Sequence, residues 1–438
     1  MTNLFSQFIS KFLTSLISIA FTLTGIKSGT SSEEVKVPDN FTPVLRFIVC
    51  SDIHLNGEEN QEAAERLRNL FADMYAYSEG SEYKNFDAFL VAGDFTGGGA
   101  EKEYEMFNKI IAGNMKDGTQ LITVLGNHEF IEYRDVDATV GYDVYKKLIN
   151  EEVDTDIVIN GYHFISVSYD DNGKSFTGKM SWLNERLANA TKEDPSKPVF
   201  VMNHPHPFLT VYGSVNWSDM SLRTVLSKYP QVVDFSGHSH YAPVDPRSVW
   251  QGEFTAVGCG SLSAFMGNLN YIDGDKDAPG KSGGAWVVEC DADGNVRMKL
   301  YDAANRMFFS NVEYYFTNLS DSSKRTYNWH KQMSRDTAPE FPENASVSAA
   351  VNENGEAVIS FPEAAGYYEA ENYKIKVTDS KNKTIYENTV ISEYVRATDD
   401  DVTVSLGALA AGEYKVTVNA YSPYAKHGGQ LKSTVTIN

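Results

Sequence analysis

Five apolar stretches that each end in residues typical of metal ligands constrain the fold of this chain more than any other feature. The first is the run Val44–Val49, which is followed by Asp52-Ile53-His54. Continuous apolar runs of this kind are typical of strands buried on both faces in an α/β protein. Because sites in such proteins form beyond the carboxyl ends of the strands, we expect the polar ends to converge. The other four stretches are FDAFLVAGD (86–94), QLITVLGNHE (120–129), KPVFVMNHPHP (197–207) and VVDFSGHSH (232–240).

Helical patterns alternate with these strands. Residues 60–80, 101–112 and 180–190 carry apolar residues at helical spacing. In residues 253–307 the pattern differs: short apolar runs indicate antiparallel strands, with Asp293-Gly294 as a hairpin turn. The predicted fold class is therefore α/β (α+β): a two-sheet β-sandwich core flanked by helices, followed by a small carboxyl-terminal all-β sandwich.

The two ends of the chain differ from this core. Residues 1–40 hold a basic residue, an apolar run and a polar exit, which predicts a signal peptide or an uncleaved amino-terminal anchor. Residues 318–344 lack sustained periodicity and are predicted to be a linker. Residues 345–438 alternate apolar and polar positions between turns, which predicts a separate β-sandwich. The three cysteines lie in apolar contexts and are predicted to be core residues.

The charge balance limits the kinds of partner. The chain has 38 basic and 59 acidic residues, for a net charge of -21. This balance argues against a broad basic surface, so we expect no binding of double-stranded nucleic acid. A phosphate substrate would instead need metal ions to supply positive charge.

The polar strand ends offer imidazole, carboxylate and amide ligands without a thiolate, a mixture that suits Mn, Fe or Zn better than Ca or Mg. Seven side chains exceed what one tetrahedral ion needs, and they fit two ions if one carboxylate, most naturally Asp94, bridges them. Two ions roughly 3.5 to 4 Å apart can hold a hydroxide and clamp a phosphoryl group for in-line attack. His128 is then left to protonate the leaving oxygen. The seven predicted ligands are Asp52, His54, Asp94, Asn127, His204, His238 and His240.

The order of these motifs resembles that of the calcineurin-like metallophosphoesterases. The match consists of D-x-H at 52–54, G-D at 93–94, G-N-H-E at 126–129, a single histidine at 204 and G-H-x-H at 237–240. The resemblance covers roughly residues 44–305 and implies that residues 41–317 form the catalytic domain. It implies one metal held by Asp52, His54, Asp94 and His240, a second held by Asp94, Asn127, His204 and His238, and His128 as the acid.

At one position the chain departs from two branches of this family. Purple acid phosphatases have a tyrosine three residues after the bridging aspartate, and protein serine/threonine phosphatases have an aspartate there, whereas this chain has Gly97. The charge-transfer tyrosine is therefore missing, and so is the carboxylate expected to orient His128.

At the carboxyl end, residues 406–429 resemble the penultimate-strand region of fibronectin type III domains.

Together these features predict a secreted or cell-surface binuclear-metal phosphoesterase, either a phosphatase or a phosphodiesterase. The expected substrate is a small phosphoester such as a nucleotide, a sugar phosphate or an envelope phosphodiester. The carboxyl-terminal domain is expected either to be a spacer or to contact carbohydrate or the cell surface. The alternative is an inactive surface protein that binds through this β domain, although the costly grouping of polar side chains argues against it.

Overall fold

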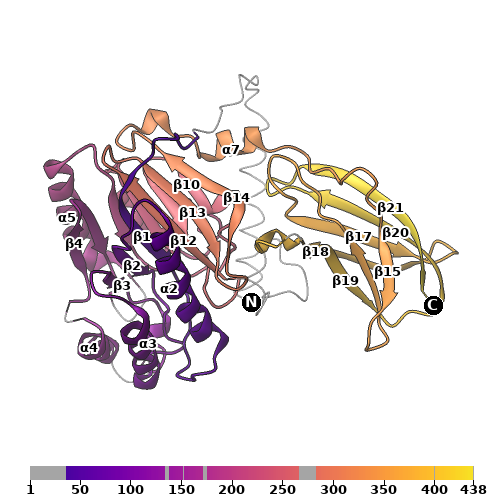
Figure 1. Ribbon diagram of the computed structural model, residues 1–438, viewed down its shortest axis with the longest axis horizontal. Helices are drawn as coiled ribbons and strands as arrows, with labels where there is room; N and C mark the ends of the chain where they lie inside the picture. Colours follow the sequence, from indigo (N-terminus) through magenta and orange to yellow (C-terminus); the bar gives the residue numbers. More distant parts are fainter. Residues whose placement is uncertain are drawn as a thin grey trace.

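The computed structural model describes residues 36–133, 138–150, 152–170, 175–265, 283–398 and 400–437. A helix-flanked core of two sheets lies beside a carboxyl-terminal β domain (Figure 1). The predicted signal or anchor segment, residues 1–40, lies outside the described residues except for its last five. Among the described helices, none is long and apolar enough to cross a membrane.

The first sheet has the strand order β14-β13-β12-β1-β2-β3. Its β1, β2 and β3 are parallel neighbours, and β12 to β14 extend it as an antiparallel meander. The predicted turn between β12 and β13 is present, with Gly294 at a φ of 77°. The strands are β1 (Pro43–Cys50), β2 (Ala88–Val91), β3 (Gln120–Thr123), β12 (Gly284–Asp291), β13 (Val296–Asp302) and β14 (Met307–Phe316).

The second sheet has the strand order β10-β11-β9-β6-β5-β4, in which β11, β9, β6 and β5 are parallel. Three of the five predicted ligand strands therefore lie in the first sheet and two in the second. The strands are β4 (Thr155–Ile159), β5 (Tyr162–Ser166), β6 (Val199–Met202), β9 (Val232–Ser236), β10 (Val249–Gln251) and β11 (Thr255–Gly258).

The two sheets pack face to face through aromatic side chains. The ring of Phe47 in β1 contacts those of Phe164, Phe200 and Phe235 in the second sheet, with centroids 5.0, 4.7 and 5.9 Å apart. Successive strand residues face opposite sides, so Ile48 instead packs with the helices. This two-sided burial explains the uninterrupted apolar run in the sequence.

Helices cover the outer faces of both sheets (Figure 1). They are α2 (Glu62–Gly80), α3 (Glu101–Asn114), α4 (Ala138–Leu148), α5 (Met180–Glu193) and α6 (Met220–Leu226). Short elements connect the layers: 3-10 helices η1 (His128–Phe130), η2 (Thr177–Lys179) and η3 (Pro246–Ser248), and the two-residue strands β7 (His206–Pro207) and β8 (Ser218–Asp219). All three cysteines are buried and free, as predicted.

The carboxyl-terminal domain consists of two antiparallel sheets with the orders β15-β16-β19 and β18-β17-β20-β21. They enclose their own apolar core, which includes Ile359, Tyr373 and Val416. The predicted fold class is therefore confirmed. The elements are β15 (Ser348–Val351), β16 (Ala357–Phe361), β17 (Asn372–Thr378), β18 (Thr384–Ile391), η5 (Glu393–Val395), β19 (Val402–Gly407), β20 (Gly412–Tyr421) and β21 (His427–Ile437).

The segment predicted to be a linker contains η4 (Ser322–Lys324) and α7 (Trp329–Arg335). Helix α7 is only seven residues long, which is too short to show a sustained period in the sequence. The buried Gln332 donates from Nε2 to the carbonyls of Val249 and Tyr327, both at 2.9 Å. Part of this segment is therefore fixed against the second sheet.

A partly buried ion pair joins the two domains. Arg247 of η3 lies between Asp245 and Glu371, and Glu371 directly precedes β17. Tyr394 of η5 donates its hydroxyl to Asp245 at 3.2 Å. Burial alone would lower the pKa of Arg247, but the two carboxylates outweigh it and raise the pKa. Because a charged group without its partner is costly in the interior, this contact couples the domains.

Candidate metal centre

The backbone is strained at most of the predicted ligands. Residues other than glycine with positive φ are uncommon, and each costs about 1–3 kcal/mol unless the surroundings hold it there. Here the strained residues follow β1, β2 and β9, so their side chains turn back across the strand ends. They are Asp52 (φ 51°), His54 (51°), Asp94 (50°), His238 (69°) and His240 (55°).

Backbone hydrogen bonds hold these strand ends together. The amides of Asp52 and His54 donate to the carbonyls of Gly93 and Asp94 at 3.1 and 3.0 Å. Within the second sheet, at the ends of β9 and β6, the amide of Gly237 donates to the carbonyl of His204 at 2.9 Å. The strained conformations are therefore fixed by neighbouring loops.

The first group of donors comprises Asp52, His54 and His240. The two imidazole Nε2 atoms face each other at 3.0 Å. Asp52 Oδ1 lies 2.9 Å from His240 Nε2 and 3.7 Å from His54 Nε2. Three donor atoms thus converge on one point, as ligands around an ion do.

The second group is centred on His204, whose Nε2 lies 3.0 Å from Asp94 Oδ2 and 3.1 Å from His238 Nδ1. Asn127 Oδ1 lies 3.1 Å from the same Nε2, so the amide joins this group. Asp94 also forms a group with His54 and His128. Asp94 therefore lies between the two groups, as a bridging carboxylate must.

Electrostatics keep the carboxylates of both groups ionised. Burial alone would raise the pKa of Asp52, but His240 and His204 outweigh it and hold the pKa well below its usual range. Burial opposes ionisation of Asp94 in the same way, and His204 again lowers its pKa. The buried His238 has its pKa lowered to about 4, first by desolvation and then by His204, so this imidazole is neutral. Burial opposes protonation of His204 and His54, but Asp94 and Asp52 raise the pKa of His204 to about 9 and also raise that of His54. Because a metal binds the neutral imidazole, binding of an ion would release protons from these two residues.

Two glycines of the motifs leave space for the carboxylates. A Cβ atom on Gly126 would lie 2.1 Å from Asp94 Oδ1, and one on Gly237 would lie 2.2 Å from Asp52 Oδ2. Both distances are far below van der Waals contact. The glycines in G-N-H-E and G-H-x-H are therefore needed for the ligands to occupy this arrangement, which fits a pair of metal ions.

A backbone carbonyl orients His128. Its Nδ1 lies 2.8 Å from the carbonyl oxygen of Gly97, and its backbone amide donates to Asp94 Oδ1 at 2.8 Å. Nδ1 must be the protonated nitrogen to donate to a carbonyl, which turns Nε2 towards Asp94 Oδ2, 3.9 Å away. The sequence shows that a carboxylate is missing at position 97, but it does not show that the backbone there takes over the contact.

Glu129 accepts hydrogen bonds from the loops that carry the metal donors. This fully buried carboxylate accepts the amides of Asp94, Gly126 and Thr96 at 3.0, 2.7 and 2.9 Å, and the Thr96 hydroxyl at 2.8 Å. Burial, with Asp94 nearby, raises its pKa to about 7 despite these donors. Glu129 therefore holds together the loops that carry Asp94 and Asn127.

His206 is a buried residue of β7. Its two ring nitrogens lie 2.8 Å from Ser236 Oγ and 2.7 Å from Ser239 Oγ. Burial, together with His238, lowers its pKa to about 3. His206 therefore links the chain after His204 to the loop that carries His238 and His240.

Comparison with protein families places this geometry in context. Residues 45–242 match the family described as calcineurin-like phosphoesterase, and residues 328–427 match a domain of unknown function, DUF3244. Members of the first family typically are hydrolases that hold two metal ions. No curated protein sequence matches the chain significantly.

Three solved structures illustrate the similarities. Purple acid phosphatase PPD1 from yellow lupin (Lupinus luteus) is 11% identical over 66% of this chain and 55% of its own, with a TM-score of 0.46. The FN1–FN3 domains of chicken CNTN1 are 12% identical over 37% of this chain and 46% of their own, with a TM-score of 0.18. Parabacteroides merdae β-glucuronidase is 8% identical over 87% of this chain and 62% of its own, with a TM-score of 0.25. The chain spans about half the length of the first two.

The family match covers all five motifs, and the structure brings their seven predicted ligands together. Residues 45–242 of this chain are part of a calcineurin-like phosphoesterase domain.

Proposed function

We propose that this protein is a metal-dependent phosphoric ester hydrolase that cleaves phosphomonoesters or phosphodiesters with water. The observation that carries the proposal is the pair of donor groups that meet at Asp94. A single ion would leave one group unused. The nitrogen and oxygen donors suit Mn, Fe or Zn.

When bound, two such ions supply positive charge to the phosphoryl oxygens and make water more acidic. The protein contributes the position of each donor. Asp94 belongs to the second group and also forms a group with His54 of the first, and the neutral amide of Asn127 completes the second group without adding charge. Glu129 fixes the loops that carry Asp94 and Asn127 by accepting the backbone amides of Asp94 and Gly126.

His128 is proposed as the general acid. With Nδ1–H donating to the Gly97 carbonyl, the doubly protonated imidazolium also has a proton on Nε2, and this proton passes to the leaving oxygen and leaves the neutral ring. The side chain is one third exposed, so an ester can reach it. The ring also contacts His54 edge to face, with centroids 4.4 Å apart, which limits its rotation.

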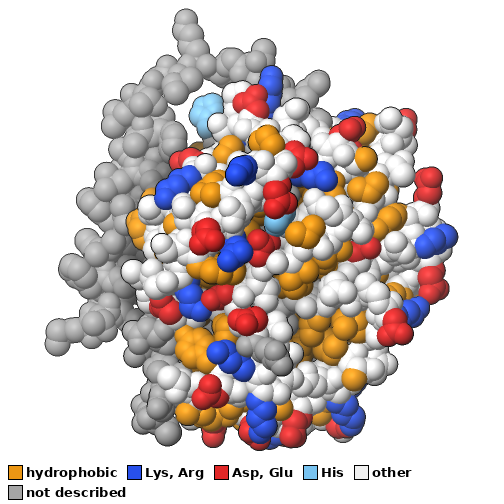
Figure 2. All heavy atoms as spheres, turned by 90° about the vertical axis from the view of Figure 1, so that its left-hand side faces the viewer, with side chains coloured by type: hydrophobic (Ala, Val, Ile, Leu, Met, Phe, Trp, Pro, Cys, Tyr) orange, Lys and Arg blue, Asp and Glu red, His pale blue; other side chains and the backbone are white. Residues whose placement is uncertain are grey.

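Substrate and location are proposed from the chemistry of the chain. A small phosphoester such as a nucleotide, a sugar phosphate or an envelope phosphodiester suits an acidic protein whose phosphate site depends on bound ions. On the face shown in Figure 2, acidic and basic side chains are interspersed. The proposed location is secreted or at the cell surface, where the carboxyl-terminal domain would contact carbohydrate or the cell surface.

Metal analysis with ester hydrolysis tests the proposal. Residues 41–438 should bind about two transition-metal ions per chain and hydrolyse nitrophenyl phosphate or bis-nitrophenyl phosphate, with activity lost on chelation. The preferred ester separates phosphatase from phosphodiesterase. Asp94→Asn should lose metal and nearly all turnover, whereas the exposed turn variant Asp293→Asn should keep both. Absence of metal and turnover after reconstitution would favour the binding-protein alternative.

A further inference from the structure

We infer that Trp217 is a specificity residue that packs against the organic group of the ester and selects planar aromatic groups over small alkyl groups. The inference rests on the proposed function for the identity of the reacting centre. Trp217 lies in the segment that leaves β6 after His204 and leads to α6. Nothing in the family's metal motifs includes it.

The position of Trp217 places an apolar surface directly beside the metal donors. Its ring is perpendicular to that of His238, with an interplanar angle of 87° and centroids 5.1 Å apart. The residue is nevertheless 37% exposed. Most large apolar side chains near the centre are buried, so an exposed indole against a metal ligand is available to contact a substrate.

The loop around Trp217 is fixed by hydrogen bonds. Its carbonyl accepts the amide of His206 at 3.0 Å, and its own amide donates to Gly213 at 3.1 Å. The edge-to-face contact with His238 also limits rotation of the indole. The indole is therefore held in place before a substrate binds, which reduces the entropy lost on binding.

The carboxyl-terminal domain supports this arrangement. Tyr212, in the same loop, stacks on Tyr241 with centroids 4.6 Å apart and an interplanar angle of 24°. The guanidinium of Arg247 lies over the ring of Tyr212, 3.8 Å from its centroid. Arg247 also forms an ion pair with Glu371 of the β domain. Contacts thus run from the β domain to the loop that carries Trp217.

The chemistry of an indole selects the kind of ester. Its flat apolar face gains contact with an aromatic or heteroaromatic ring, whereas a methyl group covers little of it. We expect the preference for an aromatic group to be about three- to tenfold in affinity, which is the range of a single aromatic contact.

Binding of phosphonates tests the inference without turnover. In the metal-loaded protein, calorimetry should show phenylphosphonate binding about three- to tenfold more tightly than methylphosphonate. Trp217→Leu should remove this difference, and Trp217→Phe should retain most of it. Trp182→Leu is the matched control, because Trp182 of α5 is a half-buried surface tryptophan in a different element and should leave the difference unchanged.

Ester hydrolysis gives the second measurement. Trp217→Leu should lower kcat/KM for phenyl phosphate, mainly through a higher KM. The kcat/KM for ethyl phosphate and the metal content should not change. Equal losses on both esters would overturn the inference, because they would indicate that Trp217 only supports His238. So would the absence of any phenylphosphonate preference in the wild-type protein. If the preference and its loss are seen but no ester is hydrolysed, the proposed function fails and the inference about Trp217 stands.

Discussion

At the scale of single residues, His128 has two possible roles that a substitution separates. The geometry favours an acid held by Gly97, but the side chain also lies in a donor group with His54 and Asp94. His128→Ala should keep about two metal ions and lower kcat by about 10²- to 10⁴-fold, as expected for a general acid. The loss should be smaller for nitrophenyl phosphate than for ethyl phosphate, because nitrophenolate needs less protonation. Loss of a metal ion from this variant would instead make His128 a ligand.

Glu129 illustrates a residue that acts through its neighbours. Glu129→Gln has nearly the same shape, but its amide nitrogen cannot accept hydrogen bonds and would face N–H donors of Thr96 or of Asp94 and Gly126. Each unsatisfied buried donor costs about 1–3 kcal/mol. We expect a lower melting temperature and weaker metal binding, measured by thermal unfolding and metal titration. A variant with unchanged melting temperature and metal affinity would exclude this supporting role.

At the scale of secondary-structure elements, Phe47 connects the two sheets. Its ring contacts three phenylalanines of the opposite sheet and is fully buried. Phe47→Ala should cost about 3–5 kcal/mol in the free energy of unfolding, measured with urea, because it leaves a cavity. Phe47→Leu should cost less, since it keeps more of the volume. Similar small losses for both would show that the sheets dock mainly through other contacts.

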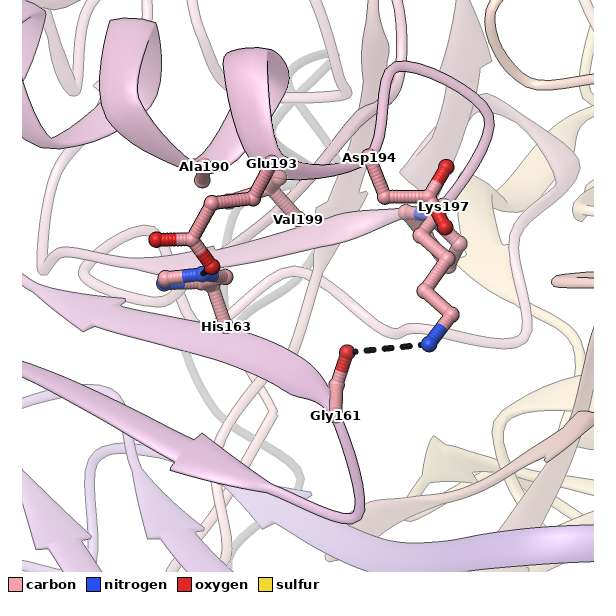
Figure 3. Close-up of a pocket in the computed structure, with 8 residues that line it drawn as sticks. Gly161, His163, Ala190, Glu193, Asp194, Lys197 and Val199 are labelled. Atoms are coloured by element: carbon pink, nitrogen blue, oxygen red, sulfur yellow. Dashed lines mark hydrogen bonds and ion pairs between the residues drawn. The ribbon is translucent and has the colours of Figure 1, made fainter.

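The pocket between β5 and α5 predicts a pH dependence of stability. Figure 3 shows His163 beside Glu193. Both residues line a pocket of about 240 Å³, together with Asp194 and Lys197. His163 Nδ1 lies 2.8 Å from Asp156, and Nε2 lies 3.1 Å from Glu193. Burial opposes protonation, but the two carboxylates outweigh it and raise the pKa of His163.

A raised histidine pKa stabilises the folded state only while the imidazole is protonated. The stabilisation is complete below the unfolded-state pKa of about 6.5 and disappears as the pH rises through the folded-state pKa. His163→Gln should therefore be less stable than the wild-type protein at acidic pH, and the difference should shrink at alkaline pH. Melting temperatures measured across this range test the prediction, and a constant difference would contradict it.

The predictable part of the fold is the part that rests on local patterns. The five strand ends, the helices between them and the alternating strands of residues 345–438 follow from burial and period, and the structure contains them. The ligands could be predicted because imidazoles and carboxylates after apolar runs have few other uses. The sequence does not show the left-handed backbone of Asp52 or His238, the Gly97 carbonyl contact or Trp217, because these depend on loops positioned by distant residues.

At the scale of the whole molecule, the β domain is predicted to stabilise the catalytic domain. Removing residues 340–438 would expose Arg247 and Tyr212 and take away Glu371. We expect the truncated protein to melt at a lower temperature than the full chain, and Glu371→Gln in the full chain to shift the melting temperature in the same direction by less. Unchanged melting of the truncated protein, with lost attachment to cells, would instead make the β domain an anchor.

The distribution of the ligands over two sheets has a consequence for the assembled protein. Each donor group takes residues from both sheets, and His54 and His240, whose ring nitrogens face each other, are 186 residues apart in the chain. A bound ion would therefore act as a cross-link between the two halves of the sandwich, and unfolding would have to release it. Stability should then rise with the concentration of free metal, and a fragment with one sheet alone should not retain the ions.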